Sequence, residues 1–273
     1  MTPRITRDTV LCISIAASPG NLGSAIHNAG YAALGLDFVY KACRVHDLAG
    51  AMAGVRALGI RGCSVSTPFK REVLAHLDEL DQGARAVGAV NTIVNDGGRL
   101  TGFNTDVDGA VGAFDEAGIL SSDRVLVLGA GGVARAIVHA LRLRGVACVT
   151  VACRSPAPGG LPGLPVVPWS ERQEVQAEIL INATPVGMDP APEALPMAEP
   201  RLRSFRAVVD VVAVPPVSSL VRAAARAGLV AVPGHVMALH QAIRQFELYT
   251  GQKAPQAAMR EALLAVLAAS GRG

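Results

Sequence analysis

Short apolar runs alternate with amphipathic stretches over the first hundred residues, a pattern typical of an α/β chain. Three apolar runs predict buried strands at residues 9–15, 37–43 and 60–66. Two amphipathic stretches predict the helices between them, at residues 24–34 and 47–58. Asp47 stands at the N-cap of the second helix, and Pro68 predicts the first turn of a third. The β-α-β-α-β order indicates a mainly parallel sheet with helices on its faces.

Two further strands are expected at residues 89–94 and 99–103, on either side of the sequence Asn-Asp-Gly-Gly at residues 95–98. Turns of this composition join antiparallel strands, because glycine readily adopts the positive φ angles of a tight hairpin. A β-hairpin is therefore expected at the end of the first series of elements.

A second α/β series begins near Arg124 and contains six strand candidates before residue 235. The candidates are RVLVLG, ACVTVAC, LPVVP, AEILINA, AVVDVV and LVAVPG. Proline-rich loops are expected at residues 155–168 and 185–200. Six strands with intervening helices are the content of a complete dinucleotide-binding sheet. Two helical stretches, at residues 236–250 and 255–269, end the chain and are expected to pack back on the first series.

The predicted fold class is therefore α/β, with two domains. Residues 1–105 together with residues 236–273 are expected to form an N-terminal α/β substrate-binding and catalytic domain. Residues 106–235 are expected to form a doubly wound, Rossmann-type nucleotide-binding domain.

Composition narrows the function classes. Hydrophobic residues make up 51% of the 273 and aromatic residues only 4%, so the core is expected to consist of Ala, Val and Leu. No apolar run reaches the roughly 20 residues that cross a bilayer, and the N-terminus lacks the apolar run of a secretory signal. The net charge of +3 comes from scattered residues, which argues against nucleic acid. The five widely spaced cysteines are expected to be reduced, in a cytoplasmic protein without a metal site.

A glycine-rich turn follows the first strand of the second series, within RVLVLGAGGVARAIVHAL at residues 124–141. Gly129, Gly131 and Ala134 match the pattern G-x-G-x-x-G/A. The first glycine makes the tight turn, the second admits a pyrophosphate, and the small third residue lets helix and strand pack closely. Amides at the helix N-terminus bind the phosphates. The cofactor is expected to contact the whole turn, namely Gly129, Ala130, Gly131, Gly132, Val133 and Ala134.

The end of the second strand of this series predicts which nicotinamide cofactor binds. An NAD site usually places an acidic residue there to hold the ribose hydroxyls. Here ACVTVACRS contains no acid, and Arg154 and Ser155 follow the strand instead. Because an arginine pairs with a 2′-phosphate and stacks on adenine, the sequence predicts NADP.

Three polar stretches follow strand-like runs of the first series. They are SVSTPFK, which ends at Lys70, GAVNTI, which contains Asn91, and GFNTD, which ends at Asp106. Polar side chains at strand ends build many small-molecule sites in α/β proteins. Since a lysine and a carboxylate together can hold and pass a proton, Lys70 and Asp106 are the candidate catalytic pair.

Together with GAGGVARA, INATPVGM and GHVMALHQA, these stretches resemble, in order and spacing, the shikimate/quinate dehydrogenase family. The resemblance covers nearly the whole chain. It implies an NADP-dependent oxidoreductase of the chorismate pathway that supplies the aromatic amino acids. The implied reaction is a reversible hydride transfer between NADPH and the ketone of 3-dehydroshikimate.

The resemblance also implies roles for individual residues. Lys70 and Asp106 match the catalytic lysine and aspartate at the reacting carbon, and Lys70 is either the proton donor or an electrostatic clamp. The implied substrate-binding residues are Ser14, Ser66, Asn91 and Gln241. Beyond the glycine turn, the implied cofactor-binding residues are Arg154, Ser155, Thr184, Val212 and Met237.

This chain departs from the family pattern at several positions. The first loop has Ala16 where a second serine is usual, and Ser18 competes with Ser14 for the match to the first. Ala213 stands where most members have a tyrosine, and Ser64 where they have an asparagine. With these differences the chain most resembles the shikimate dehydrogenase-like branch of the family. The differences concern how the substrate is held, and they leave the hydride chemistry intact.

Two other functions stay open from the sequence. One is a dehydrogenase of quinate or another ring hydroxy acid, possibly NAD-linked, against which Arg154 and the missing acid argue. The other is a nucleotide-binding regulatory module without turnover, against which the joint presence of Lys70, Asp106, Asn91 and Gln241 argues. The expected partner is a small-molecule substrate, with no nucleic acid and no membrane, and the expected state is a monomer or homodimer.

Overall fold

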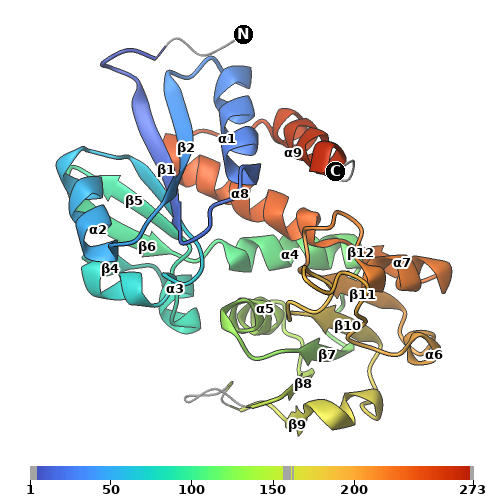
Figure 1. The fold of residues 1–273 in the computed structure, drawn as a ribbon. Coiled ribbons are helices and arrows are strands. Elements are labelled where there is room, and N and C mark those ends of the chain that lie inside the picture. The colour runs from blue at the N-terminus through green and yellow to red at the C-terminus, as the bar shows by residue number, and fades with distance from the viewer. Residues whose placement is uncertain (1–4, 156–160, 162, 271–273) are drawn as a thin grey trace. The chain divides into compact units, whose positions relative to one another are not determined.

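The computed structural model describes residues 5–155, 161 and 163–270, and the chain divides into two compact units (Figure 1). The first unit extends to Thr105 and also takes in Gln241–Val266. The second unit comprises Asp106–His240 and the residues from Leu267 onward. Each unit is built around one six-stranded sheet.

The sheet of the first unit is mixed, with the strand order β2-β1-β3-β5-β6-β4. Its strands are β1 (Val10–Ala16), β2 (Phe38–Arg44), β3 (Gly62–Val65), β4 (Glu79–Leu80), β5 (Thr92–Asp96) and β6 (Arg99–Phe103). β1 runs parallel to β2 and β3, whereas β5 runs antiparallel to β3 and β6. A turn of Gly97 and Gly98, both at positive φ, joins β5 to β6 and confirms the predicted hairpin.

Helices cover both faces of this sheet. The helices are α1 (Leu22–Ala33), α2 (Leu48–Ala57), α3 (Gln82–Val87), α8 (Gly234–Thr250) and α9 (Gln256–Ser270), and the last two, which end the chain, return to this sheet as predicted. On one face, Ile13 of β1 and Cys63 of β3 share an apolar cluster with Met52 of α2. On the other face, Phe246 of α8 stacks on Tyr31 of α1.

The predicted helix at Pro68 is wrong. Residues 67–71 form turns, and a 3₁₀ helix begins only at Glu72 (Glu72–His76). The carbonyl oxygen of Lys70 accepts a hydrogen bond from the N–H of Val90, 2.8 Å away, and not from a residue one helical turn further along. This bond fixes the Lys70 segment to the segment that precedes β5.

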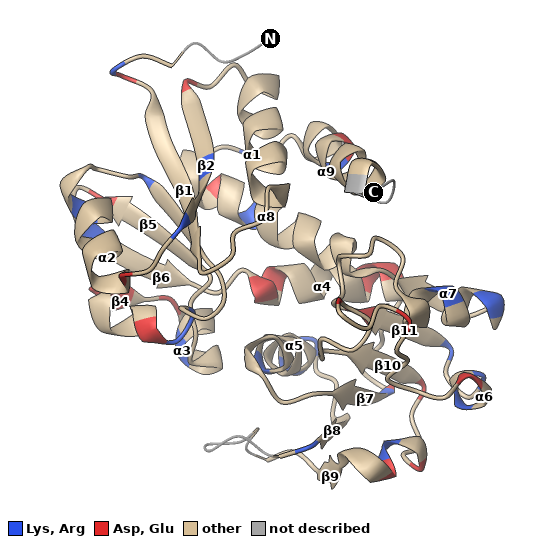
Figure 2. Cartoon of the chain, in the orientation of Figure 1, with Lys and Arg blue, Asp and Glu red and all other residues tan. Residues whose placement is uncertain are grey.

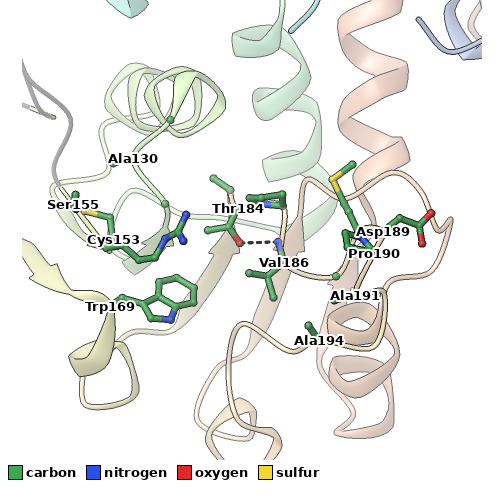
Figure 3. A pocket seen from close by; sticks show the side chains of 17 residues that line it. Ala130, Cys153, Ser155, Trp169, Thr184, Val186, Asp189, Pro190, Ala191 and Ala194 are labelled. Atoms are coloured by element: carbon green, nitrogen blue, oxygen red, sulfur yellow. Dashed lines mark hydrogen bonds between the residues drawn. The ribbon is translucent and has the colours of Figure 1, made fainter. Parts of the chain in front are cut away.

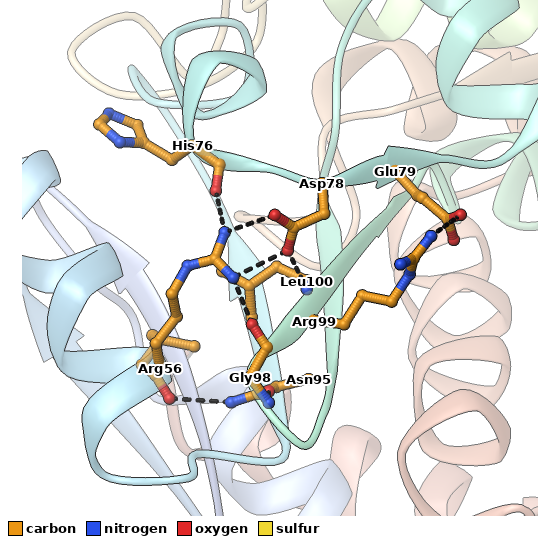
Figure 4. Close-up of polar contacts among 9 residues, drawn as sticks. Arg56, His76, Asp78, Glu79, Asn95, Gly98, Arg99 and Leu100 are labelled. Atoms are coloured by element: carbon orange, nitrogen blue, oxygen red, sulfur yellow. Dashed lines mark hydrogen bonds and ion pairs between the residues drawn. The ribbon is translucent and has the colours of Figure 1, made fainter.

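A polar cluster anchors the β5–β6 hairpin within the first unit (Figure 4). The guanidinium of Arg56 donates to the carboxylate of Asp78 and to the carbonyl oxygens of His76 and Gly98. Asp78 also accepts from the N–H of Leu100, at 2.7 Å. The hydrogen bond from Arg56 holds the pKa of the Asp78 carboxyl below its ordinary value. These contacts fix the hairpin to α2.

The sheet of the second unit is entirely parallel, with the strand order β12-β11-β10-β7-β8-β9. Its strands are β7 (Arg124–Leu128), β8 (Cys148–Cys153), β9 (Val166–Pro168), β10 (Ile179–Asn182), β11 (Ala207–Asp210) and β12 (Val230–Val232). Counted from β7 as the first strand, the order from the β9 edge is 3-2-1-4-5-6, the order of a dinucleotide-binding sheet. All six predicted strands are confirmed, although residues 156–160 and 162 of the first expected loop lie outside the described residues.

Both faces of this sheet are covered, as a parallel sheet requires. The helices are α4 (Asp106–Ala117), α5 (Gly132–Leu143), α6 (Glu199–Leu202) and α7 (Ser219–Arg226), with a 3₁₀ helix at Trp169–Gln173. Leu180 of β10 shares an apolar cluster with Leu220 of α7. Its neighbour Ile181 points to the opposite face and is equally buried, and α4 and α5 pack on the sheet.

In the part of the chain that the structure describes, none of the helices combines the length and the apolarity that crossing a membrane requires. Acidic and basic side chains are interspersed along the elements of each unit (Figure 2).

Candidate active site

The glycine turn between β7 and α5 has the shape that phosphate binding requires. Gly129 has a φ of 102°, and a Cβ at this position would lie 3.0 Å from the carbonyl oxygen of Ala183, at the end of β10. A side chain would therefore force the two strand ends apart. At Gly131 and Gly132, by contrast, a Cβ would meet no atom within 4 Å, so the space before α5 is open. Gly131 is the N-cap residue of α5, whose first amides are thus available to an anion.

A cavity of about 1010 Å³ opens beside this turn, at the carboxyl ends of the strands (Figure 3). Six of the predicted cofactor-binding residues line it, namely Gly129, Ala130, Gly131, Arg154, Ser155 and Thr184. Gly132, Val133 and Ala134 are not among the described residues of this wall. They begin α5, where Gly132 is exposed and Ala134 is fully buried. Val212 and Met237 are buried, and the structure does not bring them into the described wall of the cavity.

A buried polar network holds the cavity wall in the loop after β10. The amide and hydroxyl of Thr184 both donate to Oδ1 of Asn182, at 3.1 and 2.6 Å. Nδ2 of Asn182 donates to Asp210 at 2.9 Å, and the hydroxyl of Ser218 donates to the same carboxylate at 2.5 Å. Burial raises the pKa of Asp210, and these hydrogen bonds oppose the rise. Asp210 therefore joins the loop after β10 to the start of α7.

The first unit brings together the ends of its three polar stretches. Besides the bond from Val90 to Lys70, the N–H of Val65 donates to the carbonyl oxygen of Asn91 at 2.8 Å. Oδ1 of Asn91 accepts from the N–H of Thr105 at 2.7 Å. Asp106, the next residue along the chain, is buried, with 8% of its surface exposed. The fold thus places Lys70, Asn91 and Thr105 in one small region of the first unit.

A row of hydroxyl side chains crosses the same sheet. Ser14, Ser64 and Thr92 are paired in register on β1, β3 and β5, so their side chains share the face that α8 covers. Gln245 of α8 accepts from the hydroxyl of Ser64 at 3.0 Å and donates to that of Thr92 at 2.9 Å. The Thr92 hydroxyl donates to Oδ1 of Asn91 at 2.8 Å. A continuous chain of hydrogen bonds therefore connects α8 to Asn91.

Aromatic side chains enclose this row. The hydroxyls of Tyr40 and Tyr249 both contact Ser64, at 2.8 and 3.0 Å. The ring of His27 stacks on Tyr40, with 4.4 Å between centroids, and its Nε2 lies 3.2 Å from Gln245. Burial lowers the pKa of His27 to about 4, so the ring is neutral at neutral pH. His27 is therefore a packed side chain of the core.

Comparisons with known proteins identify the family. Residues 15–93 match the model of the shikimate dehydrogenase substrate binding domain, and residues 234–264 match that of the shikimate 5′-dehydrogenase C-terminal domain. A shikimate dehydrogenase-like protein of Haemophilus influenzae is 39% identical over 94% of this chain and 97% of its own length. The chain belongs to the shikimate dehydrogenase family.

Other members of the shikimate dehydrogenase family match this chain over nearly its full length. A protein of Rubrobacter xylanophilus named shikimate dehydrogenase (NADP(+)) is 43% identical over 96% of this chain and 98% of its own length. Among solved structures, shikimate 5-dehydrogenase of Thermus thermophilus, in complex with NADP(H) and shikimate, superposes with a TM-score of 0.83 at 35% identity. That superposition covers 94% of this chain and the whole of that one.

The remaining substrate-binding positions that family resemblance implied have different surroundings. Ser14 lies within β1 and is half-buried, whereas its competitor Ser18 is exposed in the loop after the strand. Ser66 is exposed directly after β3. Gln241 is half-buried on α8, one helical turn before Gln245 and hence on the same helix face.

Sequence reasoning missed Gln245, although its spacing of four residues from Gln241 was a usable signal, because such a pair shares one helix face. It also missed Asn182 and Asp210, which end the neighbouring strands β10 and β11 in register. In the cavity wall it missed Trp169, the first residue after β9. Each of these residues contacts or lies beside a residue that is distant in the sequence.

Proposed function

We propose that this protein is an NADP-dependent shikimate dehydrogenase, which transfers a hydride reversibly between NADPH and the ketone of 3-dehydroshikimate. The observation that carries the proposal is the end of β8. Arg154 and Ser155, with no acidic residue, face the cavity beside the glycine turn, in a chain that matches an NADP-dependent relative over nearly its full length. We propose that residues 106–235 bind the cofactor and that residues 1–105 with 236–273 bind the substrate.

The residues of the second unit fit NADP. The open space at Gly131 and Gly132 admits a pyrophosphate to the first amides of α5. Arg154 supplies a fixed positive charge where the extra 2′-phosphate requires one. When bound, NADPH supplies the hydride. The cavity of about 1010 Å³ is at the upper end of the range for small-molecule sites, as a dinucleotide requires.

The proton chemistry is assigned to Lys70 and Asp106. A carbonyl that receives a hydride develops negative charge on its oxygen, so a cationic donor at that oxygen lowers the barrier. Lys70 serves there as proton donor, and Asp106 orients the ammonium group and stabilises its charge. The hydrogen bond from the N–H of Val90 to the carbonyl oxygen of Lys70 restrains the backbone that carries the lysine side chain. This restraint limits the positions that the ammonium group can occupy. Ser14, Ser66, Asn91 and Gln241 are proposed to bind the carboxylate and ring hydroxyls of the substrate.

A substrate panel tests the proposed activity. Initial rates are measured for shikimate, quinate and cyclohexanol, each with NADP⁺ and with NAD⁺. We expect kcat/KM to be largest for shikimate with NADP⁺. A higher value for quinate with NAD⁺ would replace the proposal with the quinate dehydrogenase alternative, and equal rates for shikimate and cyclohexanol would reject a ring hydroxy acid as substrate.

The variant Lys70→Met tests the role of the lysine. Loss of a positioned proton donor is expected to lower kcat by about 10³-fold and to remove one limb of the pH–rate profile. If kcat falls while the shape of the profile is unchanged, Lys70 acts as an electrostatic clamp and not as the acid. Arg71→Met, at the exposed neighbouring position, is the matched control.

A further inference from the structure

We infer that Trp169 forms one wall of an adenine subsite in the cavity of the second unit, with the purine ring of the cofactor stacked on its indole. The inference rests on the proposed NADP-dependent function and adds the residue that recognises the base. Trp169 is the one tryptophan in the sequence, so its fluorescence reports on this position alone.

The register of the sheet places Trp169 beside the arginine proposed to bind the 2′-phosphate. β8 and β9 are parallel, and Cys153 is paired with Pro168. The next residue of each strand, Arg154 and Trp169, therefore leaves the sheet at the same edge, on strands about 5 Å apart. Both line the cavity, and Figure 3 shows the indole ring there. In NADP the 2′-phosphate and the adenine are attached to the same ribose, so groups that bind them must be neighbours.

The indole is held rigidly, with one side left for a ligand. The guanidinium of Arg172 lies over the ring, with its central carbon 4.2 Å from the centroid. Arg172 is itself fixed by hydrogen bonds to the carbonyl oxygens of Trp169 and Pro196, at 2.7 and 2.6 Å. Trp169 also packs against the apolar core cluster of the sheet. Trp169 lines the cavity and Arg172 is not among the described residues of its wall, so a part of the indole that Arg172 leaves uncovered faces the cavity.

A fixed, partly buried aromatic surface favours a flat aromatic ligand over a flexible polar one, since stacking requires no reordering of the protein side chain. Stacking of a base on an aromatic side chain typically changes affinity by a factor of about 10 or more when the side chain is truncated. A role confined to packing the 3₁₀ helix Trp169–Gln173 would leave the affinity for adenine nucleotides unchanged.

The test uses the full chain and adenosine 2′,5′-bisphosphate, which carries the adenine and the 2′-phosphate but no nicotinamide. We expect it to change the emission of Trp169 saturably in the wild-type protein, whereas nicotinamide mononucleotide leaves the emission unchanged. Calorimetry on two variants then separates stacking from packing. Trp169→Leu keeps an apolar side chain on the core, and it should weaken binding of the bisphosphate about 10-fold. Trp169→Phe keeps an aromatic face and should bind within about threefold of wild type, with the KM for shikimate unchanged in both.

Three results would overturn the subsite. The first is that the wild-type protein does not bind the bisphosphate, and the second is that it binds the bisphosphate without any change in emission. The third is that the Trp169→Leu variant binds the bisphosphate as tightly as wild type. The emission measurement needs no variant, so it decides the matter even if Trp169→Leu does not fold. Saturable quenching by the bisphosphate without turnover of shikimate would reject the proposed function while supporting the subsite.

Discussion

The two sheets of this protein place their polar side chains in different ways. In the second unit, β10 and β11 are apolar up to their last residues, Asn182 and Asp210, and Arg154 follows the end of β8. In the first unit, Ser14, Ser64 and Thr92 lie within the strands, under α8. A change at the exposed Arg154 therefore alters the ligand chemistry of the second unit and leaves its core untouched. In the first unit the core and the polar network share residues, so stability and site geometry change together.

The largest expected effect is at Gly62, beneath the polar row. A Cβ there would lie within 2.4 to 2.6 Å of the ring of Tyr249, which is fully buried and bonded to Ser64. Gly62→Ala is expected to lower the free energy of unfolding by about 3 kcal/mol or more. In Gly54→Ala, on α2, the added methyl meets no atom within 4 Å, and the free energy should rise by up to about 1 kcal/mol. Urea denaturation measures the free energy of unfolding of both variants. Similar values for the two would show that α8 shifts to make room for the extra methyl group.

A second test uses the pH dependence that His27 gives to the first unit. Its pKa is about 4 in the folded protein and about 6.5 in the unfolded chain. Between these values only the unfolded chain binds the additional proton. The contribution of His27 to the free energy of unfolding is therefore fully present above pH 6.5 and is lost as the pH decreases to 4. The loss due to His27 is expected to be about 3 kcal/mol. His27→Phe keeps a stacked ring and removes the titration. A pH slope as steep in this variant as in wild type would assign the effect to other groups.

A third test compares two threonines of the same sheet. Thr92→Val removes the hydroxyl between Gln245 and Asn91, which leaves Nε2 of Gln245 without its 2.9 Å acceptor. We expect a loss of about 2 kcal/mol in the free energy of unfolding, together with a higher KM for shikimate. Thr101→Val, on β6 outside the network, should change the free energy by less than about 0.5 kcal/mol. A Thr92 variant that loses stability at unchanged KM would separate the network from substrate binding.

The smallest effect on stability is expected in the second unit. Arg154→Ala removes an exposed side chain at the cavity, so the free energy of unfolding should stay within about 0.5 kcal/mol of wild type. The ratio of kcat/KM for NADP⁺ to that for NAD⁺ should nevertheless fall about 10- to 100-fold, because the 2′-phosphate loses a charged partner. Arg203→Ala, outside this cavity, should change neither quantity. An unaltered cofactor ratio in Arg154→Ala would assign phosphate recognition to other residues.

Features that depend on neighbours along the chain could be predicted. Asp47 caps α2 through a bond from the N–H of Gly50, at 3.0 Å, as its position before the helix indicated. The hairpin at Gly97 and Gly98, the six strands of the second unit and the turn at Gly129 also follow from local conformational preferences. The helix predicted at Pro68 failed, because Val90, 20 positions away, takes the carbonyl oxygen of Lys70.

The sequence by itself determined the α/β class, the nucleotide-binding turn and the candidate residues of the site, because strand and helix periodicity and glycine chemistry operate over a few residues. Only the tertiary structure decided which distant groups complete that site. Gln245 meets Thr92 across 153 positions and Ser64 across 181, and Trp169 comes beside Arg154 through strand pairing. No local pattern specifies such contacts, since they form only where packing brings two buried polar groups, or two strand ends, within bonding distance.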